Sequence, residues 1–414
     1  MRDTFPADEV STLYLRHVST GRAALSNLLG GVVEVSSDGA WVVAADGRRY
    51  LDFGGYGVFL LGHRHPRVVA EVHRQLDRHP LATRVFLDPV QARAAAAVAG
   101  VTPDGLDYVH FVNSGTEATE TALKLARAHG RNALVTTRNG FHGKTLGALS
   151  LTSNPLYQDP FAPLLPETTA VSYGDLAELE RAVAARAGRA CVVVEPVQGE
   201  GGVVIPPPGY LPGVAALCRA YGALLVVDEI QTGMGRLGAW WGVDLDAVVP
   251  DILLVGKGLS GGVVPVAAAV TRADIYEPFS RDPFLHSSTF GGSPLACAAA
   301  QATVRTMLDE DIVPRAAKLG DQILAGVRDA CAQRGAGVVT QVRGLGLLIG
   351  VECGSQATVA ELVLELVDSG ILVNHSLNAS GVLRLTPPAI LGDAEIDTFL
   401  TTFEEALTAV AARA

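Results

Sequence analysis

The sequence predicts an α/β protein with a large domain built on a mostly parallel sheet and a smaller α+β domain at its C-terminal end. Two short apolar runs, Leu224–Val227 and Ile252–Val255, are rich in branched residues. Such runs are typical of strands buried on both faces, as in a parallel sheet. The 414 residues exceed one ordinary core, and from about Gln301 the pattern changes to helix, strand and helix. That change predicts the second domain.

The composition argues against several classes of protein. No apolar run reaches the about 18 residues that a membrane span needs, and the segment MRDTFPADEV lacks a basic-then-apolar export signal. A net charge of −11 without clustered Lys or Arg argues against a nucleic-acid partner. The five cysteines are scattered and form no CxxC pair. We therefore expect a cytoplasmic protein with free thiols, no structural metal and no membrane contact.

The first part of the chain is predicted to be a helical segment, two extended stretches and a loop. Residues 1–30 favour helix, and Val32–Val43 and Arg49–Phe53 favour strands that flank the Asp46-Gly47 turn. The segment Gly54–Pro66, GGYGVFLLGHRHP, is glycine-rich and apolar. It is either a tight loop packed on the core or a wall of a binding site. A scaffold helix is expected around Val68–Asp77.

The stretch from residue 108 to residue 130 predicts a phosphate site. The strand Tyr108–Val112 leads into Ser114, Gly115 and Thr116, and a helix follows them. Free backbone N–H groups and the positive end of the helix dipole meet at that point, where small residues allow close approach. Simple N-capping of the helix is the alternative interpretation, because Ser or Thr followed by Glu opens many helices.

Two later strand ends carry further candidates. The strand Ala133–Thr137 is followed by a loop that contains Phe141 and His142, residues which by themselves also suit core packing. The buried strand Cys191–Val194 ends in EPVQGEGG, which contains Glu200. A buried carboxylate needs a partner, so we expect an arginine or a substrate cation beside Glu200.

The two central runs end in residues that are too costly to bury without a function. Leu224–Val227 ends at Asp228, and Ile252–Val255 is followed by Lys257 between two glycines. Functional groups project from the carboxyl ends of the strands in such sheets. A carboxylate and a lysine placed in this way can hold opposite ends of one aromatic cofactor. Our hypothesis is pyridoxal phosphate (PLP), with Asp228 on the ring nitrogen and Lys257 as the Schiff-base lysine.

Two nucleotide motifs are excluded by their context. The segment Gly233–Gly238, GMGRLG, matches GxGxxG after a strand, but the following AWWGVDLDAVVPD has no helical period. A dinucleotide fingerprint requires a helix start there. Gly258 follows Lys257 where a P-loop needs Ser or Thr, and Asp251 replaces the upstream glycine.

The C-terminal third holds two more candidate contacts. Ser288 and Thr289 stand beside glycines in LHSSTFGGSPLACA, before an Ala-rich helix, and form a second candidate phosphate contact. In the smaller domain, Gln341–Glu352 and Val382–Leu385 are predicted strands that flank a helix. Arg384 precedes Thr-Pro-Pro and is either a substrate clamp or a member of a structural ion pair.

Taken together, these segments resemble the class III, fold type I aminotransferases. FVNSGTEA, FHGKTLGALS, EPVQGEGG, VVDEIQTGMGRLG, GKGLSGG and STFGGSPLACAAA occur in the family's order, roughly from Tyr50 to Pro388. The wording FHGKTLGALS, VIPPPGYL, DEIQTGMGR and PFLHSSTFGG looks closest to putrescine aminotransferases, followed by acetylornithine and ornithine aminotransferases.

The resemblance implies a PLP-transferase fold with a mostly parallel seven-stranded sheet. It implies an N-terminal segment of residues 1–53 that packs with the small domain, a large PLP-binding domain of residues 54–300 and a small domain of residues 301–414. Thr289 is expected to reach the cofactor phosphate of a neighbouring subunit, which implies a homodimer with active sites at the interface. The implied cofactor contacts are Ser114, Gly115, Thr116, Phe141, His142, Asp228, Ile230, Gln231, Lys257, Ser288 and Thr289.

The resemblance also assigns roles in catalysis. Lys257 and Asp228 are the implied catalytic residues: Lys257 forms the Schiff base and carries a proton, and Asp228 keeps the ring nitrogen protonated. Phe141 is expected to stack on one face of the ring and Ile230 to cover the other, with Gln231 near the phenolic oxygen. The implied substrate residues are Tyr56, Lys144, Glu200 and Arg384.

Two positions bear on the substrate. Lys144 replaces an arginine found in many relatives that act on ω-carboxylate or N-acylated substrates, and lysine lacks the bidentate fork. The entrance loop, Tyr56–Leu61, is apolar, and Tyr56 matches ornithine aminotransferases. Arg384 is expected to take the α-carboxylate of glutamate, and Glu200 to pair with Arg384 when an ω-amine binds. We therefore expect a ping-pong ω-aminotransferase for a diamine-like or apolar terminal amine or aldehyde, with glutamate and 2-oxoglutarate as the other pair.

Three alternatives stay open from the sequence. One is an acetylornithine or ornithine aminotransferase. A second is a PLP-dependent aminomutase or decarboxylase on the same fold. The third is a non-catalytic interaction protein, which has no need of Asp228, Lys257 and the phosphate loop together.

Overall fold

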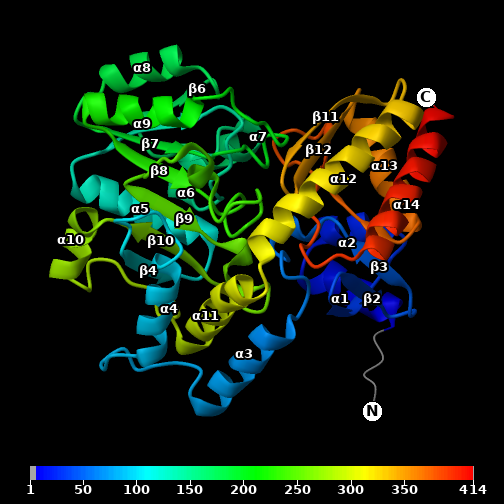
Figure 1. Cartoon of the computed structure of the whole chain (residues 1–414), viewed down its shortest axis with the longest axis horizontal. Helices are drawn as coiled ribbons and strands as arrows, with labels where there is room; N and C mark the ends of the chain where they lie inside the picture. The colour runs from blue at the N-terminus through cyan, green and yellow to red at the C-terminus, as the bar shows by residue number, and fades with distance from the viewer. Residues whose placement is uncertain (1–5, 414) are drawn as a thin grey trace.

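A seven-stranded sheet forms the centre of the large part of the protein (Figure 1). The computed structural model describes residues 6–413. Strand β10 runs antiparallel to both of its neighbours, and every other neighbouring pair is parallel. This confirms the predicted mostly parallel seven-stranded sheet. In spatial order the strands are β4 (Tyr108–Val112), β10 (Ala267–Thr271), β9 (Ile252–Val255), β8 (Leu224–Asp228), β7 (Ala190–Val194), β5 (Ala133–Thr137) and β6 (Thr168–Val171).

Strand register aligns the ends of the central strands. Val194 at the end of β7 pairs with Val227 of β8, and Asp228 pairs with Leu254 of β9. The residues that follow β7 and β9 therefore lie beside Asp228 at the carboxyl edge of the sheet, where α/β proteins place their ligands.

Helices cover both faces of this sheet. Alternate residues of β7 enter two separate apolar clusters, with Val192 and Val194 in one and Cys191 and Val193 in the other. Burial on both faces explains why the strand sequences are continuously apolar. The surrounding helices are α3 (Pro66–Arg78), α4 (Pro89–Ala99), α5 (Gly115–Ala128), α6 (Leu146–Leu151), α7 (Pro155–Gln158), α8 (Leu176–Ala184), α9 (Tyr210–Tyr221), α10 (Ala273–Arg281) and α11 (Pro294–Asp309).

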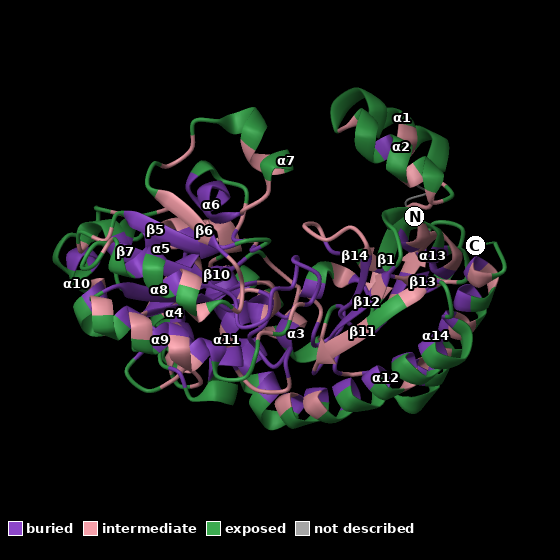
Figure 2. Cartoon of the chain, turned by 90° about the horizontal axis from the view of Figure 1, so that it is seen from above, coloured by how far each residue is buried: buried purple, intermediate pink, exposed green. Residues whose placement is uncertain are grey.

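The N-terminal segment joins a small sheet with the C-terminal part of the chain. The order is β1 (Glu34–Asp38), β2 (Trp41–Ala44), β3 (Arg49–Asp52) and β13 (Ile371–Leu372), and β13 pairs parallel with β3. The single strand expected at Val32–Val43 is wrong, because Gly39 turns the chain with a φ of 56° and divides it into β1 and β2. Helices α1 (Ala7–His17) and α2 (Thr20–Leu28) precede this sheet and are mainly exposed (Figure 2).

The small domain is an α+β unit with its own four-stranded sheet. Its sheet order is β11 (Val339–Leu345), β12 (Leu348–Cys353), β15 (Val382–Leu385) and β14 (Asn374–His375), with helices α12 (Ile312–Arg334), α13 (Gln356–Asp368) and α14 (Asp393–Ala411). The segment Gln341–Glu352, expected as one strand, is a hairpin that turns at Gly346. The predicted domain boundaries at residues 53 and 300 stay predictions.

The helices bear on two earlier expectations, the lack of a membrane span and the lack of a dinucleotide-binding helix. No helix that the structure describes between residues 6 and 413 is long and apolar enough to cross a membrane. The segment Gly233–Gly238 forms turns and is followed by the short 3-10 helix η3 (Gly242–Asp246) instead of an α-helix. The predicted failure of the GxGxxG match is therefore confirmed, because a dinucleotide pyrophosphate needs a helix N-terminus at that point.

Candidate active site

A cavity of about 240 Å³ lies at the carboxyl edge of the central sheet. Three ionisable residues reach it from neighbouring strands: Glu195 after β7, Asp228 at the end of β8 and Lys257 after β9. The sheet register places these residues together although the sequence separates them. The lining residues are Gly115, Thr116, Phe141, His142, Gly143, Glu195, Asp228, Ile230, Gln231 and Lys257.

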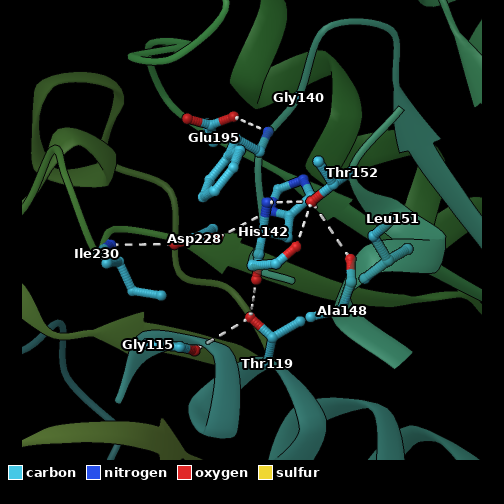
Figure 3. A network of polar contacts seen from close by, with 12 residues as sticks. Gly115, Thr119, Gly140, His142, Ala148, Leu151, Thr152, Glu195, Asp228 and Ile230 are labelled. Carbon is cyan, nitrogen blue, oxygen red and sulfur yellow. Dashed lines mark hydrogen bonds and ion pairs between the residues drawn. The ribbon is translucent and has the colours of Figure 1, made fainter. Parts of the chain in front are cut away.

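The Asp228 carboxylate is buried and pairs with His142 (Figure 3). Oδ2 of Asp228 lies 2.7 Å from Nδ1 of His142, and Oδ1 accepts the Ile230 amide at 3.1 Å. Burial acts to lower the pKa of His142, but the hydrogen bond and charge of Asp228, with the charge of Glu195, raise it overall. The contact therefore favours a protonated His142 behind the Asp228 carboxylate.

The His142 backbone is fixed on two sides, as Figure 3 shows. Its amide donates to Thr152 Oγ1 at 2.9 Å, and its carbonyl accepts from Thr119 Oγ1 of α5 at 2.9 Å. His142 Nε2 is buried without a hydrogen-bond partner in the described chain. The orientation of His142 thus depends on the loop after β5 and on α5, so His142 positions Asp228 from behind.

Glu195 is a site residue to which the sequence analysis assigned no role. Its two carboxylate oxygens accept the backbone amides of Phe141 at 3.0 Å and Gly199 at 3.2 Å. Burial raises the pKa of Glu195 to about 7, opposed in part by His142. Glu195 therefore ties the loop that carries Phe141 to the loop that carries Glu200. The sequence signal that could have identified Glu195 is its position at the carboxyl end of a strand, next to the strand of Asp228.

Lys257 faces Asp228 across the cavity. Its backbone has a φ of 43°, a left-handed conformation that is uncommon for a non-glycine residue and is often found at functional positions. Nζ donates to Gln231 Oε1 at 3.2 Å. Desolvation lowers the pKa of Lys257, against the charge of Glu200, which raises it. A lysine in this environment loses its proton more readily and becomes a nucleophile.

The start of α5 forms the third wall. Ser114 is the N-cap, and its Oγ accepts the Glu117 amide at 3.4 Å, so its hydroxyl is occupied by capping. A Cβ at Gly115 would lie 2.8 Å from Ile230 Cδ1, so a larger residue would require the Ile230 side chain to shift. Thr116 Oγ1 lies 2.7 Å from Thr145 Oγ1. The first amides of a helix have no intrahelical partner and form an anion site.

These residues fit pyridoxal phosphate. The cavity combines a buried carboxylate for a ring nitrogen, a lysine with lowered pKa for a carbonyl carbon and a helix start for a phosphate. Phe141 and Ile230 supply apolar walls between them. No group of three or more His, Cys, Asp or Glu side chains suited to a metal occurs in residues 6–413.

Glu200 and Arg384 form a buried ion pair next to this cavity. Arg384 Nη1 lies 2.5 Å from Glu200 Oε2, and both side chains are almost completely buried. Burial acts to raise the pKa of Glu200, but the charges of Arg384 and Lys257 lower it overall. None of the Arg384 guanidinium nitrogens makes a well-directed hydrogen bond within the described residues. Its donors are therefore available to a carboxylate if Glu200 moves.

Besides Ser114, four other predicted residues lie outside the cavity lining. Lys144 is exposed, with Nζ 3.9 Å from the centre of the Tyr157 ring and 5.9 Å from that of Phe141. Tyr56 is 56% exposed in the entrance loop. Ser288 accepts from Asn113 Nδ2 at 3.0 Å, and Thr289 is exposed. Within one chain, Ser288 and Thr289 do not line the cavity.

Comparisons with known proteins agree with this geometry. The profile of the Aminotransferase class-III family matches residues 26–407. A putrescine aminotransferase from Pectobacterium atrosepticum is 42% identical over 368 residues, which cover 86% of this chain and 78% of the relative.

Two solved structures share the fold. An ornithine aminotransferase from Toxoplasma gondii, with PLP at partial occupancy in its active site, has a TM-score of 0.91 and 35% identity and covers 99% of this chain and 96% of its own. An (S)-enantioselective omega-transaminase from Thermomicrobium roseum has a TM-score of 0.90 and 30% identity and covers 99% of this chain and all of its own.

The buried carboxylate of Glu229 gives a prediction about pH. Burial raises its pKa from the ordinary 4.5 to about 7, so the folded state keeps its proton where the unfolded state has lost it. The contribution of Glu229 to the free energy of unfolding is therefore greatest below pH 4.5 and declines as the pH rises through 7. Gln at this position keeps bonds to the Val243 amide and the Thr232 hydroxyl without ionising. Glu229→Gln should therefore gain stability relative to wild type between pH 4.5 and 7.

Thermal midpoints measured by circular dichroism across that pH range test this expectation. Glu361→Gln, at a half-exposed carboxylate on α13, is the control and should follow the wild-type profile. Parallel profiles for Glu229→Gln and wild type would contradict the raised pKa.

Proposed function

The chain belongs to the class-III aminotransferases, and on that premise we propose that it moves an amino group between a terminal amine and the glutamate/2-oxoglutarate pair. As a member of this family it is a PLP-dependent transaminase that acts on an amine and a keto acid. The observation that carries the proposal is the placement of Lys257 and Asp228 on one cavity, next to the Glu200–Arg384 pair.

The chain's own residues perform the proton and binding steps in this proposal. Bound PLP supplies an aldehyde carbon that takes up amines and a ring that withdraws electrons. Lys257 Nζ, with its pKa lowered by desolvation, gives up its proton and serves as nucleophile and base. Asp228, fixed by His142, stabilises a proton on the ring nitrogen. Gln231 orients Lys257 through the hydrogen bond at Nζ.

The Glu200–Arg384 pair supports a site that serves two kinds of substrate. With glutamate, Arg384 binds the α-carboxylate, since its guanidinium offers several free donors. With an amine that lacks this carboxylate, Glu200 keeps Arg384 paired, as it does in the structure. The buried Arg384 charge therefore has a carboxylate partner in either half of a ping-pong cycle.

The amine is proposed to be a diamine or a relatively apolar terminal amine. Lys144 is held over the Tyr157 ring and offers a point charge instead of a guanidinium fork. In the entrance loop, Val58 and Phe59 are half-buried apolar residues, whereas Leu60 and Leu61 belong to the core. Carboxylate recognition at that end is accordingly weak. An acetylornithine or ornithine preference is the competing outcome, favoured by Tyr56.

Loss of the lysine tests the catalytic assignment. Lys257→Ala should lower turnover by at least about 1,000-fold, because nucleophile and base are lost together. The fold should persist, since Lys257 makes one side-chain hydrogen bond. Turnover is measured with putrescine and 2-oxoglutarate, and folding by circular dichroism. The exposed Lys318→Ala is the matched control and should behave like wild type. Normal turnover of Lys257→Ala would refute the assignment.

Substitution of Lys144 tests the substrate assignment. Lys144→Arg should raise kcat/KM for acetylornithine about tenfold, the effect of one added charge-assisted hydrogen bond of about 1.5 kcal/mol. The value for putrescine should stay within about twofold, because putrescine has no carboxylate to bind. Single half-reactions followed by cofactor absorbance give both values. A wild-type enzyme that strongly prefers acetylornithine over simple amines would overturn the proposal.

We further propose a homodimer whose subunits complete each other's phosphate site. Two segments, Val85–Leu87 and Phe284–Phe290, carry strongly exposed apolar side chains, such as Phe86 at 80% and Phe284 at 88%. Arg84 donates to the Ser288 carbonyl and joins the two segments into one surface. Exposed apolar patches of this kind mark interfaces. Thr289 lies in this surface, which supports its predicted reach into a partner's site.

The dimer is tested by a charge in the apolar surface. Phe86→Glu should halve the mass measured by light scattering and weaken PLP retention, because a buried unpaired carboxylate is costly at an interface. Leu245→Glu, at another exposed leucine, is the control and should change neither property. A wild-type chain that is monomeric and retains PLP would contradict the proposal.

A further inference from the structure

The turn Gly233–Gly238, which binds no dinucleotide, contains an arginine without an assigned role. Arg236 is 1% exposed and is among the largest completely buried side chains of the described chain. No carboxylate of residues 6–413 lies within salt-bridge distance of its guanidinium. A charge buried in this way is costly unless its donors are engaged. The contacts of Arg236 therefore indicate its purpose.

The Arg236 guanidinium donates to three carbonyls from three separate segments. Nη1 donates to Leu347 at 3.1 Å and to Pro387 at 2.5 Å, and Nη2 donates to Gly57 at 3.5 Å. The Arg236 backbone adds a further link, since its carbonyl accepts the Leu347 amide at 2.9 Å. One side chain of the large domain thus contacts the entrance loop and two segments of the small domain. Planar donors in a fixed fork suit such a junction.

Each end of this junction adjoins the proposed chemistry. A Cβ at Gly57 would lie 3.8 Å from Lys257 Cδ and 3.7 Å from Gln231 Cγ, so this part of the entrance loop packs on the cavity wall. Pro387 follows β15, the strand that carries Arg384. Arg236 therefore contributes to fixing the distance between the entrance loop and Arg384.

Neighbouring polar contacts continue the same junction. The Thr386 amide donates to the Phe53 carbonyl at 2.7 Å, and Thr386 Oγ1 donates to the Gly54 carbonyl at 2.7 Å. Burial lowers the pKa of Arg236 to about 9, and the nearby charge of Asp52 opposes part of that shift. Asp52 itself is held by the Gly54 amide at 2.9 Å. The charge of Arg236 thus lies near Asp52, in the segment just before the entrance loop, as well as near the carbonyls.

We propose that Arg236 is a positioning residue that holds the entrance loop and the Arg384 strand in register with the Lys257 cavity. This role deepens the proposed function and rests on it. Arg236 touches neither substrate nor cofactor. It sets where Tyr56 and Arg384 stand, and thereby how tightly the site binds its two substrates.

The test compares two substitutions of Arg236 with a matched control. Arg236→Met removes the donors, and Arg236→Lys keeps the charge but loses the fork. Arg315→Met is the control. Arg315 also donates to carbonyls just after Pro387, those of Ala389 at 2.6 Å and Leu391 at 2.8 Å, but its side chain does not bond to the entrance loop. The holoenzymes are studied by half-reaction kinetics, by cofactor absorbance and by hydrogen exchange of peptides covering residues 54–61.

Both Arg236 variants should lose about tenfold in kcat/KM for amine and for 2-oxoglutarate, mainly through KM, since small displacements of binding groups are costly. Exchange of residues 54–61 should become faster, while cofactor content and absorbance stay as in wild type. Arg315→Met should change none of these properties.

Kinetics and exchange that match wild type in both Arg236 variants would overturn the inference. It would also be overturned by equal losses in Arg315→Met, or by Arg236 variants that do not fold, since either result indicates a general structural role. A wild-type enzyme without transaminase activity would defeat the proposed function instead. In that case the exchange data still decide whether Arg236 holds the loop.

Discussion

The buried contact between Asp228 and His142 is the interaction on which the rest of the site depends. A carboxylate at the end of a central strand is buried, so it needs a charge partner and hydrogen bonds. His142 meets this need only because the loop after β5 folds back toward α5, where Thr119 and Thr152 hold it. The same loop carries Phe141. The need to pair the buried Asp228 carboxylate with His142 therefore also places Phe141 at the cavity.

Polar contacts add direction to the apolar packing that joins the small domain to the large one. Glu200 and Arg384 pair across the two domains, and Arg236 spans from the large domain to carbonyls of the small domain and the entrance loop. Hydrogen bonds are directional, so they define relative position more narrowly than apolar packing does. A substrate site at this junction is accordingly sensitive to groups that do not touch the substrate.

Much of the fold could be predicted from the sequence, because buried parallel strands leave continuous apolar runs such as Leu224–Val227. Two predicted strands were wrong, because turns at Gly39 and Gly346 interrupt stretches whose sequence pattern predicts a single strand. Such turns depend on backbone conformation, which a glycine permits but does not impose. Glu195 was missed for a different reason, since its role comes from amides contributed by distant loops.

The sequence by itself determined which residues stand at the strand ends and start the phosphate-site helix, because those follow from local patterns and from motifs in a recognisable order. Only the tertiary structure decided that His142 supports Asp228, that Lys144 rests on Tyr157 and that Arg236 reaches carbonyls of three segments. These contacts join segments distant in the chain, and they depend on strand register and on loop paths. Local propensity carries no information about either, and burial then decides which charges must meet.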